Sequence, residues 1–475
     1  MNLLSKAASE SNGTNSWVSQ CENPRVAAGC SRKPLGRIPE QTNERRRKRT
    51  HMVKNRIPVC HVAVCSTGRL LNLTMKMKDQ TKTKDKPANG KRIVGVDMHP
   101  DLFSAAALRG SNAKEARVQW IHDRVPVAKL ETWAAKHLDK DDIVTLEASS
   151  NSFEVVGRLH RIGITAVVLE SAQAAKVREN YCNDDRHSAV KLARVYLSGL
   201  AKEVWPPDEQ TRERREVLFA YRNAVKDSTR SRNRIRSALN EYCVRLPKGT
   251  RLGEESGLNK ALGMRKWTPV QEALLRAKFR ELWEAEKLRK DFGQVMLSEL
   301  LCNAEWKKLW RLMGVGVCTA YALMALMGTV NRFPTAKKLA GYFGLAPGRE
   351  QSGNDKEGKS LGIGLRGRSD MRALLMQAAQ NVMMNRKSPL HAWGWRLTYR
   401  KAKNVAVVAV ARKLVVSIWH LLKGHWSELN ETPEQLKAKL YVIATELGKK
   451  QLKEMKYENR EAFVTAQLQT IFIPT

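Results

Sequence analysis

Three acidic residues occur where folding could bring their carboxylates together. Asp97 ends the short apolar run IVGVD, and Glu147 ends the similar run DIVTLE. Short runs rich in β-branched residues predict buried strands, and an acid at the end of such a strand is costly to bury unless it binds a cation or is hydrogen-bonded. A third acid, Asp184 or Asp185, stands just before a helical pattern. These residues predict a cluster of carboxylates drawn from three distant parts of the chain.

Such a cluster would be suited to metal-assisted chemistry. Converging carboxylates repel one another unless divalent cations lie between them. Two Mg²⁺ ions about 4 Å apart can activate an attacking oxygen and stabilise a leaving oxygen at phosphorus. A strand-terminal aspartate taken alone is more often a structural cap, so the prediction depends on the whole set of acids in its order. That set indicates a magnesium-dependent reaction at a phosphodiester.

The elements that must position these acids follow a definite order. We expect strands at 93–97, 103–108, 116–120, 142–147 and 164–169, and helices at 127–138, 153–161, 172–177 and 187–200. Three antiparallel strands thus precede strands that alternate with helices. This order predicts a mixed sheet flanked by helices, as in the RNase H-like (RuvC-like) fold. There the first two acid-bearing strands are neighbours, and the helix after the last strand lies over their ends.

The composition indicates a polyanionic partner. The 475 residues include 84 Lys and Arg but only 47 Asp and Glu, for a net charge of +37. This excess favours nucleic acid over a membrane surface, for which no basic amphipathic anchor stands out. We find no run of about 18 apolar residues that would predict a transmembrane helix. The eight cysteines are scattered, which is typical of free thiols in a reducing compartment. We therefore expect a cytoplasmic, nucleoid-associated protein with no membrane partner.

Changes in composition divide the chain into five parts, and the expected fold class is α/β plus α. Residues 1–90 are rich in Ser, Asn, Lys and Arg and predict a basic, disordered arm. The mixed-sheet domain is expected over 91–204, and a coiled-coil-like helical hairpin over 205–305. Residues 306–424 predict a mainly helical C-terminal domain, and 425–475 a charged helical tail.

The first helix of the hairpin is expected from 211 to 242. Its apolar stripe places Leu218, Val225 and Leu239 at one heptad position. The other faces carry basic side chains, which are Arg214, Arg215, Arg222, Lys226, Arg230 and Arg234. Two interpretations remain open: a solvated helix face, and a basic surface along a nucleic-acid backbone that is also an oligomer contact.

A glycine turn opens the C-terminal part. Gly314 and Gly316 lie between helical stretches in LMGVGVCTA and resemble a helix-hairpin-helix turn. Glycines let a backbone approach a phosphate, and the N–H groups of the next helix would point at it. A tight turn without a ligand is the equally good alternative.

A polar, glycine-rich segment follows, GREQSGNDKEGKSLGIGLRG, at 348–367. Ser352 precedes a glycine there, and composition alone would make it an ordinary loop serine. A serine hydroxyl is a poor nucleophile unless cations or a base activate it. The arginines that flank the segment are suited to a reacting phosphate, and they are Arg349, Arg366, Arg368 and Arg372.

At these residues the chain resembles the insertion sequence 110 family of transposases, also called 116/110/902. The C-terminal signature consists of GVGVCTA, NRFPTAKKLAGYFGLAPG, QSG and GLRGRSDMRALLMQAA. The resemblance covers about residues 93–200 and 308–422. It implies a RuvC-like DEDD domain joined to a C-terminal transposase domain. It also implies an enzyme that exchanges DNA strands without hydrolytic loss of bond energy.

The resemblance assigns roles to particular residues. Its first three acids fall on Asp97, Glu147 and Asp185, and the family register of the third motif favours Asp185 over Asp184. Its serine, which becomes covalently linked to DNA, falls on Ser352. It implies donor and target DNA, an element-encoded non-coding RNA (a bridge RNA) that pairs with both, and a homo-oligomer, a dimer or a tetramer. In such an assembly the acid domain of one protomer and the serine domain of another form composite sites.

The chain departs from the family at the fourth acid. Ser188 stands there, and a serine is a neutral, weaker metal ligand than aspartate. Either one metal is bound less tightly, or His187 or Asp184 compensates, or the chain is a decayed, inactive copy that still binds nucleic acid. Without the family signature, the acids and the charge alone would favour a metal-dependent nuclease of Holliday-junction type.

Overall fold

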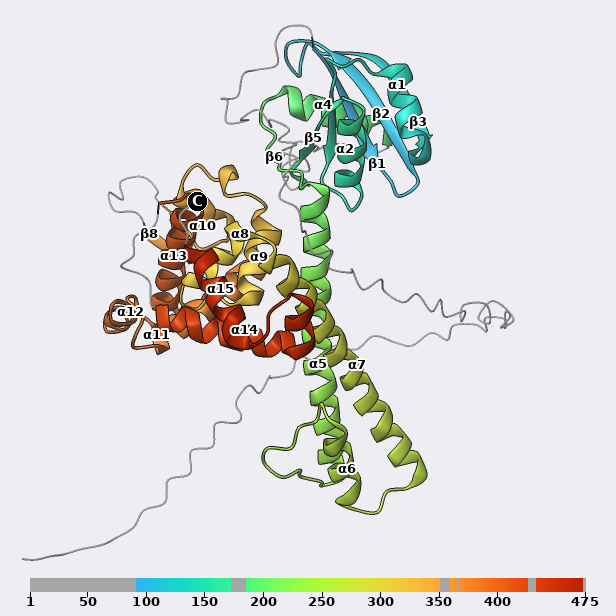
Figure 1. Cartoon of the computed structure of the whole chain (residues 1–475). Helices are drawn as coiled ribbons and strands as arrows, with labels where there is room; N and C mark the ends of the chain where they lie inside the picture. Colours follow the sequence, from blue (N-terminus) through green and yellow to red (C-terminus); the bar gives the residue numbers. More distant parts are fainter. Residues whose placement is uncertain (1–90, 172–184, 351–358, 365–366, 426–432, 473–475) are drawn as a thin grey trace, which may run out of the picture. The chain divides into compact units, whose positions relative to one another are not determined.

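The computed structural model describes residues 91–171, 185–350, 359–364, 367–425 and 433–472 (Figure 1). The predicted basic arm at 1–90 and the predicted helix at 172–177 lie outside these residues.

Six strands form one mixed sheet. They are β1 (Arg92–Met98), β2 (Leu102–Arg109), β3 (Arg117–Pro126), β4 (Ile143–Glu147), β5 (Thr165–Leu169) and β6 (Glu203–Val204). Their order in the sheet is β3-β2-β1-β4-β5-β6. β1, β2 and β3 are antiparallel, and β4 and β5 run parallel to β1. The predicted mixed sheet with helices is confirmed; β6, antiparallel to β5, was not predicted because two residues carry no periodicity.

Helices cover both faces of this sheet. They are α1 (Leu130–His137), which follows a single 3₁₀ turn at Val127–Lys129, α2 (Ser152–Arg161) and α4 (Asp185–Leu197). Val94 and Val96 of β1 belong to the buried cluster that includes residues of α1 and α2. Ile93 belongs instead to the cluster that includes Ala189 and Ala193 of α4. Successive side chains of β1 therefore alternate between the α1–α2 face and the α4 face.

A long helical hairpin follows the sheet domain. It consists of α5 (Glu209–Glu241), α6 (Glu255–Gly263) and α7 (Pro269–Leu301). Asp208 caps α5 through the backbone N–H of Thr211, and Thr268 and Gln271 form a capping box on α7. α5 and α7 lie side by side (Figure 1). Their ion pairs show that they are antiparallel, since Arg214 pairs with Glu299 and Arg234 pairs with Glu281.

The hairpin only partly matches the predicted stripe. Leu218 and Leu239 are buried as expected, but Val225 is 37% exposed. Arg214, predicted on an outer face, is buried against Glu299 of α7. The α6 helix was not predicted, because Pro247 and several glycines favoured a loop in this segment.

The C-terminal region is mainly helical around one large core. Its elements are α8 (Ala304–Lys307), η2 (Lys308–Arg311), α9 (Val317–Met327), η3 (Val330–Arg332), α10 (Ala336–Tyr342), β7 (Pro347–Glu350), β8 (Lys359–Ile363), α11 (Ser369–Met384), α12 (His391–Thr398), α13 (Lys403–Leu422), α14 (Pro433–Glu454) and α15 (Arg460–Phe472). From Thr319 onward every residue of α9 is buried, so α9 is the central helix of this core. α13 alone among the described helices is long and apolar enough to cross a membrane. Burial of one of its faces in the core accounts for that composition without a membrane.

Candidate active site at the carboxyl ends of β1 and β4

Two of the predicted acids lie at the same edge of the sheet. The parallel register pairs Val96 of β1 with Leu146 of β4, so Asp97 and Glu147 are the next residues on these neighbouring strands. Val96 and Leu146 both contribute to the α1–α2 core. By alternation, Asp97 and Glu147 both face the side of α4. Adjacent strands are about 4.8 Å apart, which is a suitable spacing for two carboxylates that share a cation.

Helix α4 lies directly against β1 near these acids. A side chain at Gly95 would come within 1.9 Å of the Ala189 carbonyl oxygen and 2.8 Å of the Ala193 nitrogen. Only a glycine permits this approach of helix to strand. Ser188 precedes the contact and is half-buried, and Asp185 is the first residue of α4. The side chain of Asp185 is outside the described residues, so its direction is not assigned.

Another acid, Asp123 of β3, links the start of α4 to this end of the sheet. Ser104 is paired with Asp97 across β1 and β2. The Ser104 hydroxyl donates to Asp123 at 2.7 Å, and Arg186 Nε donates to the other carboxylate oxygen at 2.8 Å. These hydrogen bonds and the charge of Arg186 lower the pKa of Asp123. The amino end of α4 thereby lies at the same end of the sheet as Asp97.

Asp123 was missed from the sequence. The third strand was predicted to end at residue 120, whereas β3 continues to Pro126. The β-branched residues Ile121 and Val125 could have extended it. Among the described residues, no group of three acidic, histidine or cysteine side chains is gathered closely enough to hold a metal.

The glycine turn has a clear structural role. Gly314 has a positive φ of 78°, and a side chain there would meet the Ala378 carbonyl oxygen of α11 at 2.6 Å. Close packing of this turn against α11 therefore requires a glycine at position 314. Gly316, by contrast, is exposed with open space beside it, at the amino end of α9.

A buried lysine holds this turn in place. Lys439 of α14 donates to the carbonyl oxygens of Trp310, Leu312 and Val315 at 2.8, 2.6 and 3.0 Å. Burial lowers the pKa of Lys439 to about 8, so the ammonium still predominates at neutral pH. Its three N–H groups match three acceptors. Nothing in the sequence predicted this lysine, because it lies 124 residues beyond Val315 in a charged amphipathic helix.

The predicted serine lies between two strands that were not expected. β7 and β8 pair antiparallel, with Glu350 opposite Lys359, and residues 351–358 connect them. Ser352 falls in this connection and Arg366 lies after β8, and both are outside the described residues. Arg349 lies on β7, with a side chain outside the described set.

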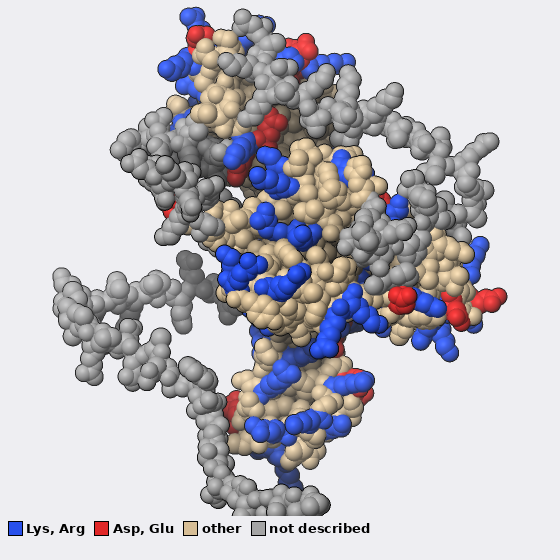
Figure 2. Space-filling view, turned by 90° about the vertical axis from the view of Figure 1, so that its left-hand side faces the viewer, with Lys and Arg blue, Asp and Glu red and all other residues tan. Residues whose placement is uncertain are grey.

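The two remaining arginines, Arg368 and Arg372, follow the glycine-rich segment and make hydrogen bonds within the protein. Arg368 donates to both carboxylate oxygens of Asp370, at 3.1 and 2.7 Å. Arg372 donates to the carbonyl oxygens of Gly344 and Gly364 at 3.2 and 2.8 Å. Both arginines therefore have structural partners here, and each has further N–H groups. On the face drawn in Figure 2, Lys and Arg side chains are widely spread and acidic side chains are sparse.

Comparison with known proteins identifies the family. Residues 306–393 match the family model Transposase IS116/IS110/IS902. Residues 94–244, which include β1, β4 and α4, match the transposase model DEDD_Tnp_IS110. The chain belongs to the IS110 family of transposases. The predicted family resemblance is thus confirmed.

Similar curated proteins agree with this membership. The transposase for insertion sequence element IS1111A of Coxiella burnetii is 26% identical over 340 residues, covering 70% of this chain and 89% of that protein. Pilin gene-inverting proteins of Moraxella lacunata and Moraxella bovis are each 31% identical over 111 residues, covering 23% of this chain and 34% of theirs. This IS110-family chain is a DNA transposase or recombinase, and DNA is its substrate. The DEDD class of its first matched domain suggests the use of a divalent metal.

Proposed function

We propose that this transposase cuts and exchanges DNA strands through a covalent serine–DNA intermediate, with Mg²⁺ as its metal and an element-encoded RNA as its guide. The main support is the placement of Asp97 and Glu147 at the ends of adjacent parallel strands, on the face that α4 covers. Carboxylates in that position are typical of phosphoryl-transfer sites that use metal ions.

The donor set fits a hard divalent cation. Asp97 and Glu147 supply carboxylate oxygens, which Mg²⁺ prefers, and Asp185 would add a third from the start of α4. Ser188, one turn further on, would offer a neutral oxygen in the fourth place. A bound Mg²⁺ supplies charge stabilisation at phosphorus and at the leaving oxygen.

The proposed covalent step takes place at Ser352. Its Oγ attacks a backbone phosphorus, the hydroxyl proton leaves to a base, and an Oγ–P ester forms as the P–O bond to the departing strand breaks. The departing strand carries away a free hydroxyl. A hydroxyl of the joining strand then attacks the same phosphorus, and Ser352 is released with its proton restored. The number of phosphodiester bonds is conserved, so no hydrolysis is needed.

Partner molecules complete the proposal. The charge of +37 supports contact with more than one nucleic-acid backbone. We propose that a bridge-type RNA pairs with donor and target DNA, which leaves sequence recognition to base pairing. We further propose a dimer or tetramer with composite sites, acting at the nucleoid in the cytoplasm. The exposed Gly316 and the first N–H groups of α9 would contact a phosphate of bound DNA.

Trapping the covalent intermediate tests this function. The native chain, incubated with Mg²⁺, guide RNA and a labelled donor DNA, should give a denaturation-resistant protein–DNA adduct. Ser352→Ala should give none, whereas Ser360→Ala, a serine eight residues further along the same segment, should keep it. Strand cleavage that persists in Ser352→Ala and is lost in Asp97→Ala would contradict the proposal and indicate a metal-dependent nuclease.

A further inference from the structure

A pocket of about 360 Å³ lies between α5 and the start of α11, and Asp97 and Glu147 do not line it. Its α5 wall is formed by Phe219, Arg222, Asn223 and Lys226. These residues are spaced at i, i+3, i+4 and i+7, so they form one face of the helix. All four residues belong to a single rigid helix, which fixes their positions relative to one another.

The pocket is lined by more positive than negative charge. Arg222, Lys226 and Arg368 face a single acid, Asp370. Burial opposes ionisation of Asp370, but the hydrogen bond from Arg368 and the charges of Arg368 and Arg222 together lower its pKa. One carboxylate therefore balances one of three cations. The lining keeps a positive charge that would attract an anion.

The acid also orients the two guanidinium groups. Asp370 Oδ2 lies 2.7 Å from Arg368 Nη2 and 3.4 Å from Arg222 Nη1. Each guanidinium has five N–H groups, and the carboxylate occupies only some of them. Lys226 is exposed and makes no ion pair within the described part of the chain. The lining thus combines two oriented arginines with an adaptable lysine, which suits a phosphate.

An aromatic ring stands beside these cations. Phe219 is 41% exposed, whereas Leu218, Ile235 and Leu239 of the same helix are buried. Aromatic rings next to basic residues are the means by which proteins bind single strands, because a base stacks on the ring while its phosphate meets a cation. A paired base has its faces covered by its neighbours, so this pocket would exclude intact duplex.

We propose that this pocket, here called the α5–α11 pocket, binds one unpaired nucleotide of a DNA strand, with its base on Phe219 and its phosphate on Arg222, Lys226 and Arg368. The assignment to DNA rests on the proposed function. Gly367 is the last residue of the glycine-rich segment that carries Ser352, and Arg368 follows it, so the pocket includes residues adjacent in sequence to that segment. The pocket would keep the bound nucleotide of that strand unpaired.

Binding of single-stranded DNA tests the proposal. The full chain and its variants are titrated into a fluorescein-labelled 15-nucleotide oligodeoxynucleotide, the same sequence as RNA, and the DNA duplex, all in EDTA. We expect Phe219→Leu to weaken single-strand DNA binding about tenfold and to leave duplex binding unchanged. Lys226→Gln should reduce the slope of log K against log salt by about one for the DNA strand.

Matched variants control for general effects. Val225→Ala removes apolar surface from α5 outside the pocket, and Arg236→Gln removes an exposed charge near the end of the same helix. Both should bind single-stranded DNA like the native chain. Equal melting temperatures exclude misfolding of Phe219→Leu, and cross-linking of 5-iododeoxyuridine to the Phe219 peptide gives a second readout.

Two results would overturn the proposal. One is a Phe219→Leu chain that binds single-stranded DNA as tightly as the native and Val225→Ala chains. The other is a loss confined to the RNA oligonucleotide. Because the binding needs neither metal nor strand cleavage, these results are independent of the Ser352 adduct, and either claim can fail alone.

Discussion

Ser188 is the residue at which this chain differs from the metal-binding pattern of its family. A neutral hydroxyl binds Mg²⁺ more weakly than a carboxylate. Ser188→Asp should therefore lower the Mg²⁺ concentration for half-maximal strand exchange by about tenfold, since an added anionic ligand is worth roughly 1–2 kcal/mol at a partly buried metal site. A magnesium titration of strand exchange checks this.

The control for Ser188→Asp is Ser198→Asp, at the residue that follows the carboxyl end of the same helix. It adds the same charge far from Asp97 and should leave the titration unchanged. If the native chain shows no exchange at any Mg²⁺ concentration and Ser188→Asp restores it, the chain is a decayed copy. An unchanged midpoint in Ser188→Asp would mean that residue 188 is not a ligand.

Single residues differed in how well the sequence predicted them. Short β-branched runs predicted the strands of Asp97 and Glu147, and in the structure Glu147 is the last residue of β4 while β1 extends one residue beyond Asp97, to Met98. Asp123 and Lys439 were not predicted. Their partners, Ser104 and the turn at Leu312, are distant in sequence, so only tertiary packing brings them together.

At the scale of elements, the site depends on the contact between α4 and β1. Gly95→Ala would force a methyl group to within 1.9 Å of the Ala189 carbonyl oxygen. We expect a loss of about 3 kcal/mol in the free energy of unfolding, with loss of strand exchange, because α4 must move away from Asp97. Urea unfolding and the adduct assay measure the two effects.

Gly157→Ala provides the comparison. Gly157 lies within α2, where an added methyl group would meet only the end of Arg212 at 4.0 Å. Alanine is the better helix former, so this variant should be as stable as the native chain or slightly more so. Equal stability of the Gly95→Ala and Gly157→Ala chains would show that the α4–β1 contact is not tight.

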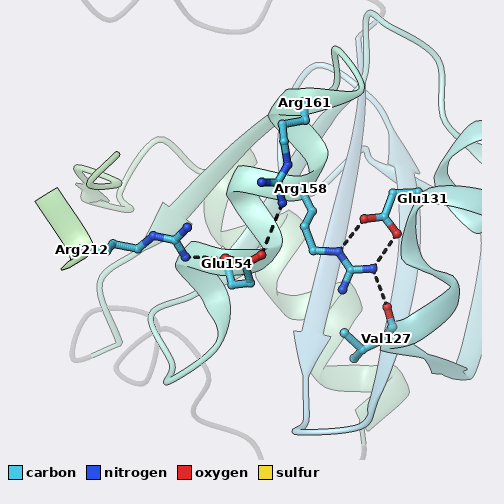
Figure 3. A network of polar contacts seen from close by, with 6 residues as sticks. All are labelled: Val127, Glu131, Glu154, Arg158, Arg161 and Arg212. Atoms are coloured by element: carbon cyan, nitrogen blue, oxygen red, sulfur yellow. Dashed lines mark hydrogen bonds and ion pairs between the residues drawn. The ribbon is translucent and has the colours of Figure 1, made fainter. Parts of the chain in front are cut away.

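A polar network joins α1, α2 and the start of α5 (Figure 3). Arg158 donates to both carboxylate oxygens of Glu131 at 2.5 Å and to the Val127 carbonyl oxygen at 3.0 Å. Glu154 accepts from Arg161 and from Arg212 of α5. The hydrogen bond from Arg158 lowers the pKa of Glu131 from 4.5 to about 2.

This shift predicts a pH dependence of stability. The carboxylate binds fewer protons in the folded than in the unfolded chain between pH 4.5 and about 2, so its contribution is present above pH 4.5 and declines as the pH falls toward 2. The stability difference between the native chain and Glu131→Gln should therefore shrink as the pH is lowered from 5 to 3, in urea titrations. The difference in the free energy of unfolding between the two chains should be modest, since the Glu131 side chain is 42% exposed.

Glu458→Gln, an exposed position outside the network, is the control and should show no such trend. A difference that is independent of pH, or that grows on acidification, would contradict the assigned pairing of Glu131 with Arg158.

Elements were predicted well where periodicity was strong. All five expected strands appear, and α5 and α7 are antiparallel as expected, because two successive long helices favour a hairpin. The hairpin of β7 and β8 was taken for an irregular loop, since its glycines hide the alternation. The exposed Val225 shows the limit of a heptad pattern, which does not reveal which face the C-terminal core covers.

At the scale of the whole molecule, charge dominates the predicted interactions. With 84 basic and 47 acidic residues, binding should neutralise many phosphates. We expect the logarithm of the DNA association constant to fall linearly with log salt, with a slope of about −6 or steeper between 50 and 200 mM salt. Fluorescence anisotropy with duplex DNA measures the slope. A flat response would mean that the basic surfaces do not carry the interaction.

The central claim is that acids from separate strands form one divalent-cation site. Competition of Mg²⁺ with Mn²⁺, followed by the EPR signal of bound Mn²⁺ in the intact chain, tests it most directly. The account predicts Mn²⁺ bound by the native chain and displaced by Mg²⁺, with binding lost equally in Asp97→Asn and Glu147→Gln but retained in Asp101→Asn, an exposed acid beyond the end of β1. Unchanged Mn²⁺ binding in either of the first two variants would contradict it.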